Sequence, residues 1–137
     1  MAVVRTRRIQ IRHPGAIYVI PGGHPGLLVA GNINLWDAPI IRNPNGSYST
    51  VHSVSWNVPV NIDHKIRNLE VLMPTALGTR EHPARALVSD REALRVFERT
   101  GRHLGMFDTG AHASTYANRL HLWFVANAKW FVLPRKK

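Results

Sequence analysis

The feature that most constrains this chain is the stretch from Ser89 to His121, whose pattern predicts two short helices joined by a turn. Ser89 and Glu92 have the spacing of a capping box, in which each side chain accepts a hydrogen bond from the other residue's free backbone N–H. Apolar residues then recur at helical spacing, and Gly101 stands where a left-handed C-terminal cap is expected. The first helix is therefore expected over 89–100.

A second helix is expected over 109–128, after a further bend at Gly105. Asp108 or Thr109 can cap its start through a side-chain oxygen. Apolar residues recur at the spacing of one helical face, namely Ala113, Tyr116, Ala117, Leu120 and Phe124. Both helices are expected to pack against one face of a sheet.

Before this unit the sequence predicts short β-strands, cut by prolines and glycines. Ile9 and Ile11 alternate with polar residues, and the run 16–20 is rich in β-branched residues and ends at Pro21. A further short apolar piece covers 27–30. The N-terminal part of the chain is therefore expected to be extended.

A tight turn is expected at 43–46, because the sequence Asn-Pro-Asn-Gly supplies a preset proline corner followed by residues that tolerate left-handed conformations. It joins strands expected over 39–42 and 48–58. A third strand, 69–73, is ended by a proline, and the residues 59–68 before it are expected to form a loop.

Together these elements predict an α+β fold, in which a small antiparallel β-sheet of the N-terminal strands plus a 39–73 meander carries the two C-terminal helices. Leu104 and Phe107 are expected to be buried between the helices and the sheet. Three regions are expected: a basic N-terminal β arm at 1–30, a central module at 31–121, and an aromatic and basic C-terminal tail at 122–137.

Four pieces of the chain, in this order, carry a resemblance to a known family: GNINLWDAPIIRNPNGSYSTVHSVSW, EVLMPT, SDREALRVFERTGRHLGMFDT and YANRLH. Together they resemble a small domain of tailed-bacteriophage virion proteins, which occurs in internal or tail-associated proteins, some of which also carry a lytic transglycosylase domain. The match covers residues 31–121 and reaches no catalytic domain. It implies a structural or accessory virion protein in several copies, assembled in the host bacterial cytoplasm and in contact with other virion proteins.

The chain is strongly basic, with 18 Lys and Arg against 8 Asp and Glu and a formal net charge of +10. Part of this excess sits at the two ends, which can neutralise phosphates or dock on an acidic protein surface. The candidate residues for a polyanion or an acidic partner are Arg5, Arg7, Arg8, Arg12, Arg135, Lys136 and Lys137. The alternative is that these ends are solvated tails that keep the protein soluble.

Large apolar residues also gather toward the ends, and clustered apolar side chains that remain exposed mark interfaces. The interface candidates are Ile9, Ile11, Tyr18, Trp123, Trp130 and Phe131. The alternative is that the C-terminal tail forms a strand that packs back on the N-terminal sheet.

The sequence predicts no enzyme, and no catalytic residue, cofactor or metal site is expected. The absence of cysteine excludes disulfides and thiolate zinc sites. The acidic residues are scattered over turns, loops and helix starts, whereas glycoside cleavage needs two carboxylates across one cleft. His103, His112 and His121 do not share one helical face, and no metal-ligand motif or G-x-S-x-G elbow is present. No apolar run approaches the ~20 residues of a membrane span.

Three functions remain open from the sequence, in descending order of support. The first is a structural or accessory protein of the phage head, tail or interior that takes part in virion assembly through protein–protein contacts. The second is an internal virion protein whose basic arms contact packaged DNA. The third is an accessory that binds or degrades the cell wall, suggested only by the transglycosylase domains beside which related modules occur.

Overall fold

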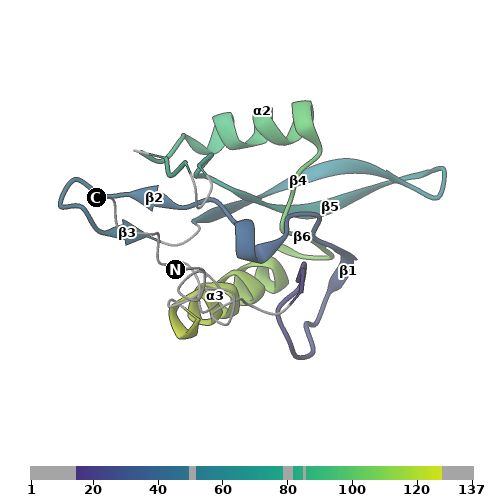
Figure 1. The fold of residues 1–137 in the computed structure, drawn as a ribbon. Helices are drawn as coiled ribbons and strands as arrows, with labels where there is room; N and C mark the ends of the chain where they lie inside the picture. The colour runs from purple at the N-terminus through teal and green to yellow at the C-terminus, as the bar shows by residue number, and fades with distance from the viewer. Residues whose placement is uncertain (1–14, 50–51, 79–81, 85, 128–137) are drawn as a thin grey trace, which may run out of the picture.

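The computed structural model describes residues 15–49, 52–78, 82–84 and 86–127 and has an α+β fold (Figure 1). A four-stranded antiparallel sheet lies between two helices, and two further short strands form a small sheet of their own. In chain order the elements are β1 (Leu27–Ala30), the 3-10 turn η1 (Leu35–Asp37), β2 (Ile41–Arg42), β3 (Tyr48–Ser49), β4 (Ser53–Ile62), β5 (Lys65–Pro74), α2 (Asp90–Thr100), β6 (Gly105–Phe107) and α3 (Gly110–Ala126).

The strand order in the main sheet is β1-β6-β5-β4, so β6 is inserted between β1 and β5. β4 and β5 pair along their whole length, from Ser53 opposite Pro74 to Ile62 opposite Lys65. β6 pairs with β5 only over residues 70–72. The sheet is therefore four strands wide at its middle, and the outer half of the β4–β5 hairpin extends past it as a two-stranded ribbon (Figure 1).

The two helices lie on opposite faces of this sheet (Figure 1). Side chains alternate along a strand, so Leu69 and Val71 of β5 pack toward α2, whereas Leu72 packs with α3. In β6, Met106 likewise packs toward α2 and Phe107 packs toward α3. The expectation that both helices share one face is therefore wrong, because β6 leads the chain through the sheet layer from one face to the other.

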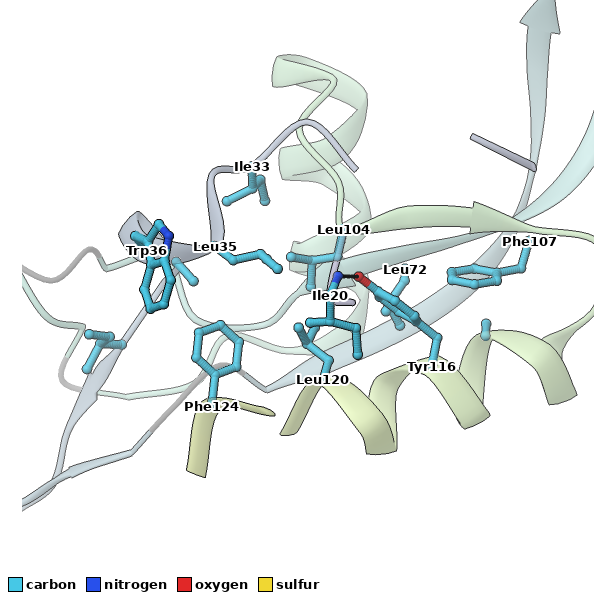
Figure 2. Close-up of a cluster of buried hydrophobic side chains, with 13 residues drawn as sticks. Ile20, Ile33, Leu35, Trp36, Leu72, Leu104, Phe107, Tyr116, Leu120 and Phe124 are labelled. Carbon is cyan, nitrogen blue, oxygen red and sulfur yellow. Dashed lines mark hydrogen bonds between the residues drawn. The ribbon is translucent and has the colours of Figure 1, made fainter. Parts of the chain in front are cut away.

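The larger core lies between the sheet and α3 (Figure 2). The apolar stripe predicted for this helix is confirmed by four buried residues, Ala113, Tyr116, Leu120 and Phe124. Leu104 and Phe107 are also buried here, at 1% and 0% exposure. The Tyr116 hydroxyl accepts the Ile20 N–H at 3.3 Å, and the Tyr116 ring centroid lies 5.2 Å from that of Phe107. The helix is thus fixed by ring packing together with one buried hydrogen bond.

Residues 16–20, expected to form a strand, form a loop instead. The Leu35 N–H donates to the Ile17 carbonyl at 2.7 Å, which ties this loop to η1. Ile20 is buried in the α3-side core. The described part of the expected arm, residues 15–30, therefore packs on the body of the protein, and its β-branched run serves burial rather than strand pairing.

The expected loop at 59–68 is wrong, because these residues continue β4 and β5 into a tight hairpin. Asp63 and His64 at its tip have φ of 51° and 68°, the left-handed conformation that one common two-residue hairpin turn requires at both positions. Pro59 is compatible with β4 because β4 is the outer strand of the sheet, and proline is tolerated on such a strand where its nitrogen faces the open edge. The Asp-His pair lacks the glycine that usually marks such a turn in a sequence.

The turn at 43–46 lies between β2 and β3 as predicted, but these strands form a separate two-stranded sheet. The strand expected over 48–58 is divided into β3 and β4, and the residues between them, 50–51, lie outside the described residues. The strands expected at 27–30 and 69–73 are confirmed as β1 and the second half of β5.

The helix ends follow the predicted caps. The Ser89 hydroxyl accepts the Glu92 N–H at 3.1 Å, and Thr109 caps α3 in the same way. Gly101 ends α2 in the left-handed region, with φ of 73°. Gly105, expected at a bend, instead begins β6.

We predict that Gly101→Val destabilises the protein by about 1–2 kcal/mol, because a Cβ disfavours the left-handed conformation. Among the described residues other than its two chain neighbours, no atom lies within 4 Å of the position that this Cβ would take, so the loss comes from the backbone conformation. Urea denaturation measures it, with Gly23→Val as the control at an equally open glycine whose φ is not positive. Equal losses in the two variants would contradict the assignment.

Candidate functional site

A cleft of about 210 Å³ lies at the C-terminal end of α2. Its lining comes from three parts of the chain, 33–39, 73–78 and 93–102. These are the segment around η1, the chain at and after the end of β5, and the second half of α2 with the residues that follow it. The cleft therefore exists only in the folded protein.

The cleft has an apolar floor and a charged rim. Buried side chains in the floor are Ile33, Met73, Ala76 and Ala93, and half-buried ones are Val96 and Phe97. The rim carries three exposed charged residues, Asp37, Arg99 and Arg102. An apolar hollow with a few charged groups at its mouth is suited to a ligand whose apolar part enters the hollow and whose charged groups stay at the rim.

Asn32 fixes one wall of the cleft by joining two segments that are distant in the sequence. Its side-chain amide donates to the Gly101 carbonyl at 2.9 Å, and its side-chain oxygen accepts the His103 N–H at 2.8 Å. The Asn32 N–H also donates to the His103 carbonyl, at 3.1 Å. The turn that carries Arg102 is therefore held against the segment that carries Ile33.

The two rim arginines have no ion-pair partner among the described residues. Neither Arg99 nor Arg102 has a carboxylate oxygen within 4.0 Å there, and the carboxylate of Asp37 forms no ion pair there either. Arg95, one turn earlier, differs because it lies 3.6 Å from Glu92. The cleft thus presents two exposed guanidinium groups whose planar donors can bind carboxylate or phosphate in a bidentate manner.

His103 is buried beside the cleft, directly after Arg102. Its ring meets that of Phe97 edge-on, with centroids 6.1 Å apart, and its Nδ1 has no hydrogen-bond partner among the described residues. Burial lowers the pKa of His103, opposed by a hydrogen bond with the backbone of Gly105. The ring is therefore neutral at neutral pH and serves as packing at this end of α2.

Two acidic side chains near the start of α3 also form close contacts. Asp108 Oδ1 lies 2.6 Å from His112 Nδ1, and the hydrogen bond from His112 lowers the pKa of Asp108. Both carboxylate oxygens of Glu70 accept hydrogen bonds, from Ser55 at 3.1 Å and from Asn57 at 2.9 Å. Within the described part of the chain, no group of three or more His, Asp or Glu is placed to hold a metal ion.

Two of the interface candidates from the sequence lie in the described residues. Trp123 packs within its own chain, with ring centroids 4.9 Å from Trp36 and 5.2 Å from Phe124. Tyr18 is 44% exposed and remains a candidate for contact with a partner. The candidates outside the described residues are Ile9, Ile11, Trp130 and Phe131.

The basic candidates from the sequence also lie outside the described residues, namely Arg5, Arg7, Arg8, Arg12, Arg135, Lys136 and Lys137. Arg99 and Arg102 carry no local signal of a site, because exposed arginines are common on the open face of a helix, where Arg99 lies, and in the turn after it, where Arg102 lies. The apolar wall that faces them comes from far earlier in the chain, and no local pattern indicates it.

Comparison of the chain with models of known protein families, with curated proteins and with solved structures finds no match. Among the helices of the described residues, none has the length and apolar character needed to cross a bilayer.

We predict that His103 makes folding stability fall as the pH decreases through the range below about 6.5. The pKa of His103 is lowered in the folded protein, so the unfolded chain binds the proton more readily there. The free energy of unfolding falls by up to about 1.4 kcal/mol per pH unit from this group, and the contribution is fully present above the unfolded pKa.

The measurement is urea denaturation at pH 7.5 and at pH 5.5, for the parent protein and for His103→Gln. The substitution is expected to reduce the loss of stability between the two pH values. His121→Gln, at an exposed position on α3, is the matched control and is expected to leave the loss unchanged. An identical pH dependence in His103→Gln and the parent would contradict the prediction.

Proposed function

We propose that this protein is a structural or accessory component of a tailed-phage virion, in the head, tail or interior, and that it acts through protein–protein contacts. The resemblance over residues 31–121 supports the virion assignment. Its most specific pieces lie at three places in the fold. They are the β2–β3 turn, the end of β5, and the run that begins at the C-terminal end of α2, passes through β6 and ends at Thr109, the N-terminal cap of α3.

The observation that supports contact with other proteins is the outer half of the β4–β5 hairpin, which extends beyond both helices (Figure 1). β4 is the outermost strand, so one edge of this strand has no strand partner in the described part of the chain. Along residues 65–69, β5 pairs with β4 alone. Open strand edges of this kind are common sites for the addition of a strand from another chain.

The side chains of this ribbon also favour a contact surface. Ile66 is 74% exposed, more than any other large apolar residue among those described. It lies between two exposed cations, Lys65 and Arg67. Burial of such an exposed apolar side chain by a partner would favour binding, because apolar surface would be removed from water.

The distribution of charge favours one alternative, a virion protein whose ends contact packaged DNA. The described residues hold eight of the 18 Lys and Arg and seven of the eight Asp and Glu, so nearly all the excess positive charge lies outside them. Binding to DNA through these ends would weaken steeply as salt is raised. Contacts dominated by apolar burial would change little over the same range.

The protein is predicted to be present in purified particles of the phage that encodes it, at a fixed number of copies per particle. Quantitative mass spectrometry of particles washed at high salt measures this number. Loss of the protein on washing, or a copy number that varies between preparations, would contradict a structural role.

Ile66→Glu is predicted to reduce incorporation into particles by roughly tenfold or more, because burial of a large aliphatic side chain contributes about 1.5–3 kcal/mol. The melting temperature should change little, since the side chain is already largely exposed. Leu122→Glu, at a residue 64% exposed on α3, is the matched control. Equal incorporation of both variants would show that the hairpin is not the contact surface.

A further inference from the structure

We propose that the cleft at the end of α2 binds a single aromatic side chain that lies within an acidic segment of a partner protein. The inference rests on the proposed function, because it assigns a second contact surface to a protein that works through such contacts. It differs from the hairpin in kind: the hairpin offers strand edges, whereas the cleft offers a pocket with a charged rim.

The size of the cleft indicates one ring. An apolar cavity of about 150 Å³ holds a benzene molecule, and this cleft measures about 210 Å³. Sites for small molecules and cofactors are usually larger, about 300–1,000 Å³. The floor is apolar and fixed, since Ile33, Ala76 and Ala93 are at most 2% exposed. The ring of Phe97 in the wall adds a surface for edge-to-face packing.

The charges at the rim indicate acidic neighbours for that ring. Arg99 and Arg102 have no carboxylate partner among the described residues, so a partner's carboxylate displaces no ion pair there. Arginine binds carboxylates through two parallel N–H donors, which orients the bound segment as well as attracting it. Asp37, also on the rim, repels acidic groups. The partner's carboxylates must therefore lie on the side of the two arginines.

The same charges disfavour the aromatic tail of this chain as the occupant. Trp130 and Phe131 are flanked by Lys129 on one side and by a run of basic residues, 135–137, on the other. A basic segment meets two arginines at the rim, and like charges brought together weaken binding. This applies equally to the tail of a second copy, so a different, acidic protein fits the cleft better.

The test uses the full-length protein and two fluorescent, blocked pentapeptides. One has phenylalanine between two pairs of glutamates, and the other has alanine in place of the phenylalanine. Fluorescence anisotropy gives the dissociation constants. Attraction of glutamates to the basic ends of the chain contributes equally to both peptides, so their difference reports the ring. The phenylalanine peptide is expected to bind about tenfold more tightly, the effect of burying one aromatic side chain.

Variants locate this preference in the cleft. Val96→Trp fills the hollow from the half-buried position 96 and is expected to abolish the preference for phenylalanine. If its melting shows that Val96→Trp does not fold, Thr100→Trp fills the same hollow from the exposed rim. Arg99→Gln with Arg102→Gln is expected to weaken both peptides. Arg91→Gln with Arg95→Gln removes the same charge from α2 outside the cleft and is the control.

Equal binding of the two peptides by the parent protein would overturn the proposal, as would a phenylalanine preference that survives filling of the cleft. Equal weakening by the two pairs of arginine substitutions would overturn the role of the rim. These outcomes are separate from the test of the proposed function. If the protein is found in particles but shows no preference for the phenylalanine peptide, the virion role stands and the cleft assignment is wrong. If it shows the preference but is absent from particles, the cleft assignment stands and the virion role is wrong.

Discussion

The fold depends on the pairing of β6, a strand of only three residues, with a neighbour on each side. Just before this strand the Leu104 N–H donates to the Leu72 carbonyl at 2.7 Å, and just after it the Asp108 N–H donates to the Gly26 carbonyl at 3.0 Å. Between these bonds, consecutive side chains pack on opposite faces of the sheet. Because the chain arrives from α2 and leaves into α3, this crossing places one helix on each face.

Both candidate contact surfaces follow from that crossing. The short connection from α2 to β6 carries Arg102 and is clamped by Asn32, which closes one wall of the cleft. The shortness of β6 leaves residues 65–69 of β5 with β4 as their one strand neighbour in the described chain, so the hairpin extends as a ribbon. A two-stranded ribbon is marginal by itself, and here the sheet at its base holds it. The three residues of β6 thus determine both where the wall of the cleft forms and where the edges of the hairpin remain unpaired.

Local features of this fold could be predicted from the sequence, and non-local ones could not. The caps at Ser89, Gly101 and Thr109 depend on residues within one turn, so their residue types suffice to identify them. β6 has three residues, one of them glycine, and its strand conformation comes from two neighbours far away in the sequence. The hairpin across 59–68 is an exception, since its pairing is local, and it was not predicted because the Asp63–His64 turn lacks the glycine that usually marks such a turn. The cleft was missed because Arg99 becomes part of a site only when the segment around η1 lies opposite α2.

Native-state hydrogen exchange of the backbone amides tests most directly whether β6 holds the structure together. We predict that the Leu104 amide and the β6 amides bonded to their neighbours exchange only on global unfolding, as slowly as the slowest amides of α3. Amides at the hairpin tip, around Asp63 and His64, should exchange orders of magnitude faster. Exchange of the Leu104 and β6 amides at the rate of the tip, while α3 remains protected, would contradict the central place given to this strand.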